Sequence, residues 1–357
     1  MNTILDNIEA IKKLDSKNML GSIQLLSAQV KEVWALGEKF NLPAGYKSVK
    51  KMVVLGMGGS SLCAHILSEL YKSEIKIPIE LVNDYHVPAY VDSQTLVIVS
   101  SYSGGTEEPI NAVQEAKNKQ AKIVAISSGG ELASWAKTHK VPALVFSTAH
   151  NPCGSPRMGL GYTIFGHAFV WAKAGVIKFG VKEMQTAVSA IEKFAFEFGT
   201  TVLGEANPAK KMAQDIFGRS VWYFGSEHLS GSAHAAGNQM NENAKRFGGY
   251  FIIPELNHHL LEGMMHPQSN KNNLVCVLLE SKLYDARVQK RYGVTKDVLK
   301  KNGIKFLSYQ FGSDNRLAQV CEALALSCLV SYYSALLQGI DPTAIPFVDY
   351  FKEQLKK

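Results

Sequence analysis

Two polar segments of the chain carry residue types that can move protons. Asn238–Lys245 places several amides around one carboxylate, Glu242, and Pro254–His259 follows with an imidazole at His258. A carboxylate and an imidazole can act as general base and general acid near neutral pH. A polar loop with helix caps would have a similar composition, so this pattern alone leaves both interpretations open.

Two loops rich in glycine and hydroxyl groups indicate a second kind of chemistry. Gly56–Ser61 follows the apolar run Met52–Leu55, and Ser100–Glu108 follows the apolar run Thr95–Val99. Backbone N–H groups and hydroxyls at a strand-to-helix turn bind anions, and the helix N-terminus adds positive potential. We expect both loops to face one crevice and to hold a phosphate. Helix capping by serine and threonine is the structural alternative.

Several other site classes are excluded by the same residues. A dinucleotide fingerprint needs a third glycine where Ser61 stands, and its acidic residue is not well placed, since Asp84 lies 26 positions after Gly58. No lysine follows these glycines, so the P-loop pattern is absent. No H-E-x-x-H or G-x-S-x-G motif occurs. We therefore expect neither a cofactor nor a metal.

Composition limits the partners and the compartment. The 357 residues include 38 Lys+Arg and 31 Asp+Glu, a formal charge of +7 that is scattered along the chain. A small anionic substrate explains this surplus better than nucleic acid does. Five cysteines without a close pair indicate buried reduced thiols. With no signal peptide visible and no apolar stretch of ~18 residues, we expect a cytoplasmic protein that does not enter a membrane.

Short apolar runs alternate with helical patterns in the first half of the chain, after a helical stretch over residues 3–40. A helix is predicted from about Leu62 to Tyr71. The runs that follow the first strand are Ile77–Val82, Thr95–Val99, Ile123–Ile126 and Ala143–Phe146. Buried parallel strands that alternate with helices give this pattern, so we predict an open α/β sheet.

The second half repeats this scheme. Val221–Gly225, Leu274–Leu279 and Ile304–Leu307 recur in the order of the first-half strands, at offsets of about 169, 178 and 182 residues. This indicates a duplicated module, with chance matching of apolar runs as the alternative. The repeat of the serine-rich loop contains Glu280 and Asp285, which would repel a phosphate. We therefore expect one phosphate site per chain, in the first module.

Six motifs follow one another over nearly the whole chain: Gly56–Ser60, Ser101–Glu108, Pro156–Tyr162, Asn241–Lys245, Glu255–His258 and Asp349–Lys352. In this order they resemble the bifunctional phosphoglucose/phosphomannose isomerases, a branch of the phosphoglucose isomerase superfamily. The resemblance implies an α/β fold of two tandem sugar-isomerase (SIS) domains, each a mainly parallel sheet flanked by helices. We expect a helical segment over 1–46, SIS domains over 47–204 and 205–340, and a C-terminal segment over 341–357 that carries the active-site lysine.

The resemblance also implies a role for each matching residue. Gly59, Ser60, Ser101, Ser103 and Thr106 are expected to hold the phosphate of a sugar 6-phosphate. Arg157 is expected to stabilise an enediolate, and Glu242 to move the proton between C2 and C1. His258, with Lys352 assisting, is expected to open the sugar ring. In this family the histidine comes from the neighbouring subunit, which implies a homodimer with shared active sites.

The sequence departs from the family pattern at two places. His259 stands where the family usually has asparagine, and its role is open. We expect the two histidines to lie in an extended segment, where adjacent side chains point to opposite sides. The small hydroxyl residue that admits both epimers matches either Thr343 or Ile345. The implied activity is isomerisation of glucose 6-phosphate, and of mannose 6-phosphate, to fructose 6-phosphate by a cis-enediol mechanism. A non-catalytic SIS-type sensor and another SIS enzyme, acting on an amino sugar or a pentose phosphate, are the alternatives.

Overall fold

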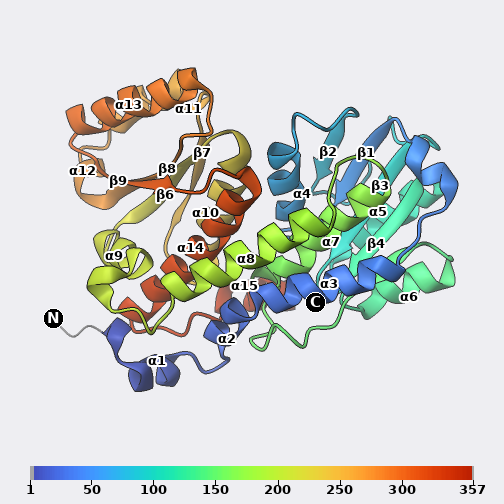
Figure 1. Ribbon diagram of the computed structural model, residues 1–357, viewed down its shortest axis with the longest axis horizontal. Coiled ribbons are helices and arrows are strands. Elements are labelled where there is room, and N and C mark those ends of the chain that lie inside the picture. Colours follow the sequence, from blue (N-terminus) through green and yellow to red (C-terminus); the bar gives the residue numbers. More distant parts are fainter. Residues whose placement is uncertain (1–3, 356–357) are drawn as a thin grey trace.

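The first half of the chain forms a five-stranded parallel sheet. The computed structural model describes residues 4–355, and Figure 1 shows two separate sheets with long helices running between and below them. In the first sheet the order is β2-β1-β3-β4-β5, and every neighbouring pair is parallel. Its strands are β1 (Lys51–Leu55), β2 (Ile79–Val82), β3 (Thr95–Ser101), β4 (Lys122–Ser127) and β5 (Ala143–Val145).

The second half forms a four-stranded parallel sheet with the order β7-β6-β8-β9. Its strands are β6 (Ser220–Gly225), β7 (Gly248–Ile252), β8 (Leu274–Ser281) and β9 (Lys305–Phe311). The strands β2-β1-β3-β4 of the first sheet have the same spatial order as β7-β6-β8-β9 of the second, which is what duplication of one module predicts. The predicted α/β class is confirmed, and one strand of the second module, β7, was not foreseen.

Some of the helices that concern the site follow single strands, and the others precede β1, connect the two sheets or follow β9. They are α3 (Leu26–Lys39), α4 (Gly59–Leu70), α5 (Glu107–Asn118), α7 (Leu160–Lys173), α8 (Val181–Glu197), α10 (Ser230–Glu242), α11 (Leu256–His259), α13 (Ala286–Lys301), α14 (Arg316–Leu337) and α15 (Pro346–Leu355). The others are α1 (Ile8–Leu14), α2 (Met19–Gln24), α6 (Gly130–Thr138), α9 (Pro208–Asp215) and α12 (Asn270–Asn273). Helix α4 begins at Gly59, three residues earlier than predicted, because it follows directly after the turn at Gly58.

One helix corrects the expectation that no stretch is long and apolar enough to span a membrane. Within the described residues, α14 has the length and composition of a spanning helix, over 22 residues. However, 94% of its most apolar window is buried inside the protein. It packs against α8, α9 and α10, so it is a core helix shared by both modules.

The two modules meet where α4 packs against α10. A Cβ added at Gly231 would lie 2.5 Å from the Cα of Ile66, so the two helices are in close contact. His65, one residue before Ile66 on α4, faces His234, three residues after Gly231 on α10. Since the contact moves backwards along α4 and forwards along α10, the two helices run antiparallel. Consequently, the N-terminus of α4 in the first module lies towards the C-terminus of α10 in the second.

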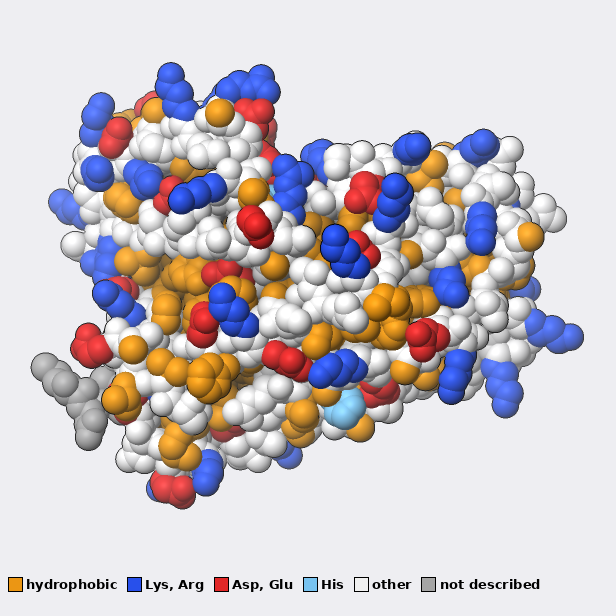
Figure 2. Space-filling view, in the orientation of Figure 1, with side chains coloured by type: hydrophobic (Ala, Val, Ile, Leu, Met, Phe, Trp, Pro, Cys, Tyr) orange, Lys and Arg blue, Asp and Glu red, His pale blue; other side chains and the backbone are white. Residues whose placement is uncertain are grey.

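Lysine and arginine side chains are scattered over the face shown in Figure 2 and do not gather in a groove. All five cysteines are buried, as predicted. Both sheets fall inside the predicted SIS domains, 47–204 and 205–340, whose exact boundaries remain predictions.

Candidate active site

The two predicted anion loops meet at the carboxyl edge of the five-stranded sheet. The backbone N–H of Tyr102 donates to Ser60 Oγ at 3.1 Å, which joins the loop after β1 to the loop after β3. The hydroxyl oxygens of Ser101 and Thr106 are 2.8 Å apart, and the N–H of Gly104 donates to Ser101 Oγ at 3.1 Å. These hydrogen bonds hold the loops Gly56–Ser61 and Ser100–Glu108 together as one double loop of defined shape.

Neither helix that starts at these loops has a side-chain cap. Helix α4 begins at Gly59 after Gly58, whose φ of 50° favours glycine, and no side chain caps it. Helix α5 follows Thr106, whose hydroxyl bonds to Ser101 instead of capping. First-turn N–H groups without a side-chain cap are available to bind an anion. The geometry therefore favours the anion-binding interpretation over the capping alternative, with Ser103 exposed on the same loop.

Arg157 lies beside the glycine loop and is almost completely buried. A Cβ on Gly59 would lie 3.8 Å from the Cα of Arg157, so the start of α4 packs directly against it. The guanidinium donates to Asn243 Oδ1 at 2.6 Å and to the carbonyls of Thr343 and Pro342 at 2.8 and 3.1 Å. Burial lowers the pKa of the Arg157 guanidinium, and the charge of Glu242 opposes this effect. Because three hydrogen bonds hold the guanidinium in place, its positive charge has a fixed position.

Glu242, the last residue of α10, forms an ion pair with this arginine. Its Oε2 lies 3.5 Å from Arg157 Nη1, and its side chain is 37% exposed. Desolvation raises the pKa of the Glu242 carboxyl above its ordinary value, and the charges of Arg157, Lys352 and Lys245 lower it in part. The structure thus places a half-buried carboxylate of the second module next to a buried cation of the first.

Lys245 is a site residue to which the sequence analysis gave no role. Its Nζ donates to the carbonyls of Asn243 and Asp341 at 3.0 and 2.7 Å. Desolvation, followed by the charge of Arg157, lowers the pKa of Lys245 to about 8. The sequence signal that could have identified Lys245 was its position three residues after Glu242 in the same motif.

Lys352 lies on α15, the last helix described. The charge of Lys352 lowers the pKa of Glu242, and the charge of Asp349 on the same helix raises the pKa of Arg157. Residues that are three or four positions apart lie on one face of a helix. This face, with Asp349 and Lys352, is therefore the one that α15 turns towards the ion pair.

The segment before α15 closes the site at Arg157. The carbonyl of Thr343 accepts from the arginine, while the Thr343 hydroxyl is buried and has no hydrogen-bond partner among residues 4–355. Most buried hydroxyls have a partner, so this one is an exception. Ile345, the other candidate for the epimer-tolerant position, is half-buried and can only offer apolar contact.

His258 is not brought to this site within one chain. Glu242 precedes β7 and His258 follows it, so the two residues lie at opposite ends of that strand. In Figure 1, α11 with His258 is well separated from α15. The expectation that His258 and His259 lie in an extended segment is wrong: both belong to the short helix α11, and both are exposed. Adjacent helical residues point about 100° apart instead of to opposite sides.

The loop of the second module is occupied by its own contacts. Ser281 Oγ donates to Gln319 at 2.7 Å, and Glu280 pairs with Lys296 at 3.0 Å. Asp285 caps α13, and its hydrogen bonds with Arg287 lower the pKa of its carboxyl to about 2. The predicted repulsion of phosphate by free charges at Glu280 and Asp285 needs correction, because both carboxylates are paired. The hydroxyl of Ser281 is buried, whereas Ser103 on the loop of the first module is exposed.

Comparison with known proteins defines the class first. Residues 46–141 match the SIS domain, and residues 205–355 match the bacterial phospho-glucose isomerase C-terminal SIS domain. The fold is similar to that of a hypothetical protein from Thermus thermophilus, with a TM-score of 0.74 and 16% identity over 98% of this chain and 93% of that one. It is also similar to the C-terminal domain of glucosamine-fructose-6-phosphate aminotransferase from Francisella tularensis (TM-score 0.62, 13% identity, 96% and 98% covered). This is a double-SIS protein.

Curated relatives narrow the class to a family. A bifunctional phosphoglucose/phosphomannose isomerase from Caldicellulosiruptor bescii is 30% identical, over 94% of this chain and 98% of the relative. One from Thermoplasma volcanium is 29% identical over 91% and 98%. A D-glucosamine-6-phosphate 4-epimerase from Sulfolobus acidocaldarius is 26% identical over 64% and 68%. The chain belongs to the bifunctional phosphoglucose/phosphomannose isomerase family.

Proposed function

We propose that this protein interconverts aldose and ketose forms of hexose 6-phosphates. Glucose 6-phosphate and mannose 6-phosphate are the proposed substrates, and fructose 6-phosphate is the common product. Family membership supports this reaction. The observation that carries it is the pair Glu242–Arg157, a carboxylate of raised pKa 3.5 Å from a buried guanidinium.

This pair has the two properties that enediol chemistry needs. A general base works best when its pKa lies close to the working pH, and desolvation moves Glu242 in that direction. A developing oxyanion is stabilised best by a positive group that need not reorganise, and Arg157 is held by three hydrogen bonds. A protein that only binds sugar phosphates needs the loops and not this pair, which argues against a sensor.

The proposed reaction starts from the open-chain aldose, with its phosphate in the double loop. Glu242 takes the proton from C2, the electron pair forms the C1–C2 double bond, and negative charge develops on O1 next to Arg157. The proton then returns from Glu242 to C1, O2 becomes the carbonyl oxygen, and its proton is transferred to O1. Because C2 is planar in the enediolate, both C2 epimers reach the same intermediate.

We assign tolerance of both epimers to Thr343 in preference to Ile345. The Thr343 hydroxyl is buried without a partner, and its carbonyl already positions Arg157. A free hydroxyl at this position can bind the O2 hydroxyl of a substrate. Thr343→Val is expected to lower kcat/KM for mannose 6-phosphate more than for glucose 6-phosphate. An equal loss for both sugars would argue against this assignment.

Ring opening requires an imidazole that a single chain does not bring to Glu242. We infer that His258 comes from a second copy of the chain, so that the working form is a homodimer with two shared sites. The charge of Lys352 acts on Glu242, which supports an assisting role for this lysine. We further propose that the enzyme acts in the cytoplasm, in glycolysis and gluconeogenesis.

A coupled assay with each hexose 6-phosphate tests the function directly. Release of fructose 6-phosphate from both substrates is expected, and it should disappear in Glu242→Gln. Binding of the sugar phosphates without turnover would support the sensor instead. Turnover of an amino sugar phosphate or a pentose phosphate alone would support the other SIS alternative.

A further inference from the structure

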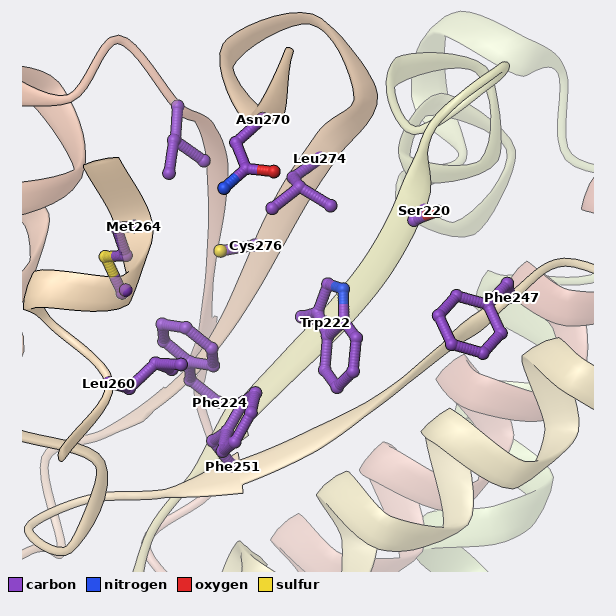
Figure 3. A pocket seen from close by; sticks show the side chains of 12 residues that line it. Ser220, Trp222, Phe224, Phe247, Phe251, Leu260, Met264, Asn270, Leu274 and Cys276 are labelled. Atoms are coloured by element: carbon purple, nitrogen blue, oxygen red, sulfur yellow. The ribbon is translucent and has the colours of Figure 1, made fainter. Parts of the chain in front are cut away.

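A pocket on the second sheet and the ion pair at Arg157 differ in the charge that they offer a ligand. The pocket, shown in Figure 3, is lined by uncharged side chains, among them Trp222, Phe224 and Phe251. A sugar 6-phosphate and its enediolate are anions, so this pocket does not suit them. The charge that suits an enediolate is that of Arg157, and the contacts of its guanidinium indicate which nitrogen faces the reacting sugar.

The three nitrogens of the Arg157 guanidinium have different contacts. Nε donates to Asn243 Oδ1 at 2.6 Å, and Nη2 donates to the carbonyls of Pro342 and Thr343 at 3.1 and 2.8 Å. A guanidinium has five N–H groups, one on Nε and two on each Nη. These bonds account for the N–H of Nε and for both of Nη2. Within residues 4–355, Nη1 makes no such bond and pairs only with Glu242, at 3.5 Å.

Asn243, which holds Nε, is completely buried and directly follows the last residue of α10. Its Nδ2 donates to Ser331 Oγ of α14 at 3.0 Å. The Ser331 hydroxyl in turn donates to two backbone carbonyls of α14, at 2.8 and 3.0 Å. Because its hydrogen is used there, the Ser331 oxygen accepts from Asn243. This contact decides which end of the amide faces Arg157, namely the oxygen.

We propose that Asn243 is a positioning residue, which orients Arg157 so that Nη1 faces the C1 oxygen of the reacting sugar. Its neighbour Glu242 is the proposed base, so two successive residues align the base and the cation with each other. Ser331 of the core helix α14 keeps the amide in the orientation that this task needs. The inference rests on the proposed function, because the oxyanion at C1 arises only in that reaction.

Two ligands separate the position of this charge from sugar-phosphate binding in general. Gluconate 6-phosphate carries a carboxylate at C1, and glucitol 6-phosphate carries an uncharged hydroxyl there. In calorimetric titrations, Asn243→Ala is expected to weaken binding of gluconate 6-phosphate by about tenfold or more. Binding of glucitol 6-phosphate should stay close to that of the wild type, because the phosphate loops are unchanged. Equal losses for the two ligands would overturn the positioning role.

Ser331→Ala tests the same inference without changing a residue that contacts Arg157. The amide of Asn243 then loses the acceptor of its Nδ2 and can turn over. A selective loss of gluconate 6-phosphate binding of roughly 2- to 10-fold is expected. Ser334→Ala is the matched control, since Ser334 is buried on the same helix and its hydroxyl has no hydrogen-bond partner among residues 4–355. Equal effects of the two serine variants would overturn the proposal.

The pH profile provides a readout that a merely structural role would not change. The charge of Arg157 lowers the pKa of Glu242, as do the charges of Lys352 and Lys245. If Asn243→Ala lets the guanidinium move away, the pKa of Glu242 rises. The acid limb of kcat/KM then moves to higher pH, because the base must be deprotonated. An acid limb at the wild-type pH would contradict the proposed role.

The binding and kinetic measurements distinguish this inference from the function on which it rests. A wild type that turns over no hexose 6-phosphate would reject the function, while selective loss of gluconate 6-phosphate binding in Asn243→Ala would still support the position of Nη1. An active wild type without this selective loss would keep the function and reject the role of Asn243. A wild type that binds neither ligand would reject both.

Discussion

His65 and His234 face each other across the contact between the two modules, with their Nδ1 atoms 3.1 Å apart. They are 169 residues apart, the same separation as that of Gly56 and Gly225 at the ends of β1 and β6. The two imidazoles therefore occupy equivalent positions of the duplicated module and lie on its internal twofold axis. A hydrogen bond between two Nδ1 atoms needs one N–H and one lone pair, so at least one ring is neutral.

This pair is expected to make stability depend on pH. Desolvation lowers the pKa of both imidazoles, that of His234 to about 4. The unfolded chain then binds more protons than the folded chain, so the free energy of unfolding falls as pH decreases from about 6.5 towards 4. Urea unfolding at several pH values measures the slope. His65→Leu with His234→Leu should reduce the slope but not abolish it, because desolvation also lowers the pKa of His167 and of His228 to about 4. An unchanged slope would contradict this cause.

Glu242→Gln is expected to lower kcat by about 10²- to 10⁴-fold, because the general base is lost. Exchange of the C2 hydrogen with solvent should disappear, while binding of the sugar phosphate is retained. Calorimetric titration and tritium release measure the two effects separately. Substantial turnover in this variant would remove the catalytic assignment.

The same substitution should stabilise the folded protein. The raised pKa of Glu242 means that the folded state binds the proton more tightly than the unfolded state does. Its contribution to stability is therefore lost as pH rises through the folded pKa. A neutral amide avoids this loss, so the gain in melting temperature of Glu242→Gln should be larger at pH 8 than at pH 4. Equal gains at both pH values would count against desolvation as the cause.

The phosphate loop can be compared with its counterpart in the second module. Ser103→Ala and Thr106→Ala should each weaken sugar-phosphate binding by roughly 10- to 150-fold, the equivalent of about 1.5–3 kcal/mol for a charge-assisted hydrogen bond. Ser281→Ala is the matched control and should leave the dissociation constant unchanged, because its hydroxyl is buried in the second module, where it donates to Gln319. Equal effects in the two modules would refute the single phosphate site.

Lys245 should set the alkaline limb of activity. Its pKa of about 8 lies far below the ordinary value, and its positive charge faces Glu242 and Arg157. Loss of that charge reduces the stabilisation of the enediolate, so kcat/KM should fall above about pH 8. Lys245→Arg should move this limb to higher pH. An identical alkaline limb in that variant would assign the limb to another group.

Mixed dimers test the origin of the imidazole. His258→Ala should impair turnover of the cyclic sugar much more than that of an open-chain substrate, while His259→Ala stays near wild type. Mixing inactive Glu242→Gln and His258→Ala chains should restore activity, because one site of each mixed dimer then holds both native residues. Mixed dimers that form without any activity would exclude the shared site.

The sequence predicted the site where local patterns are sufficient. The loops at Gly59 and Ser101 follow the apolar runs Met52–Leu55 and Leu96–Val99, and both loops lie at the ends of strands, as expected. Strand β7 was missed because it begins with Gly248 and Gly249, which have low strand propensity. The partners of Arg157 lie 86 to 186 residues away in sequence, so only the fold reveals them.

His258 marks a second limit of prediction. Its residue type suggested acid–base chemistry, yet its position at the far end of β7 from Glu242 depends on the direction of one unforeseen strand. Lys245 shows a third limit, since its lowered pKa arises from burial and from Arg157, which is distant in sequence. A motif can indicate that a residue matters without giving its task.

The tight contact of α4 and α10 at Gly231 has an evolutionary consequence. Any side chain at this position would push α4, which starts at the phosphate loop, away from α10, which ends in Glu242. Natural variation at residue 231 should therefore be as narrow as at residue 242, although the glycine has no side chain that could take part in the reaction. A search for catalytic residues by invariance alone would select both, and only a kinetic experiment would distinguish the spacer from the base.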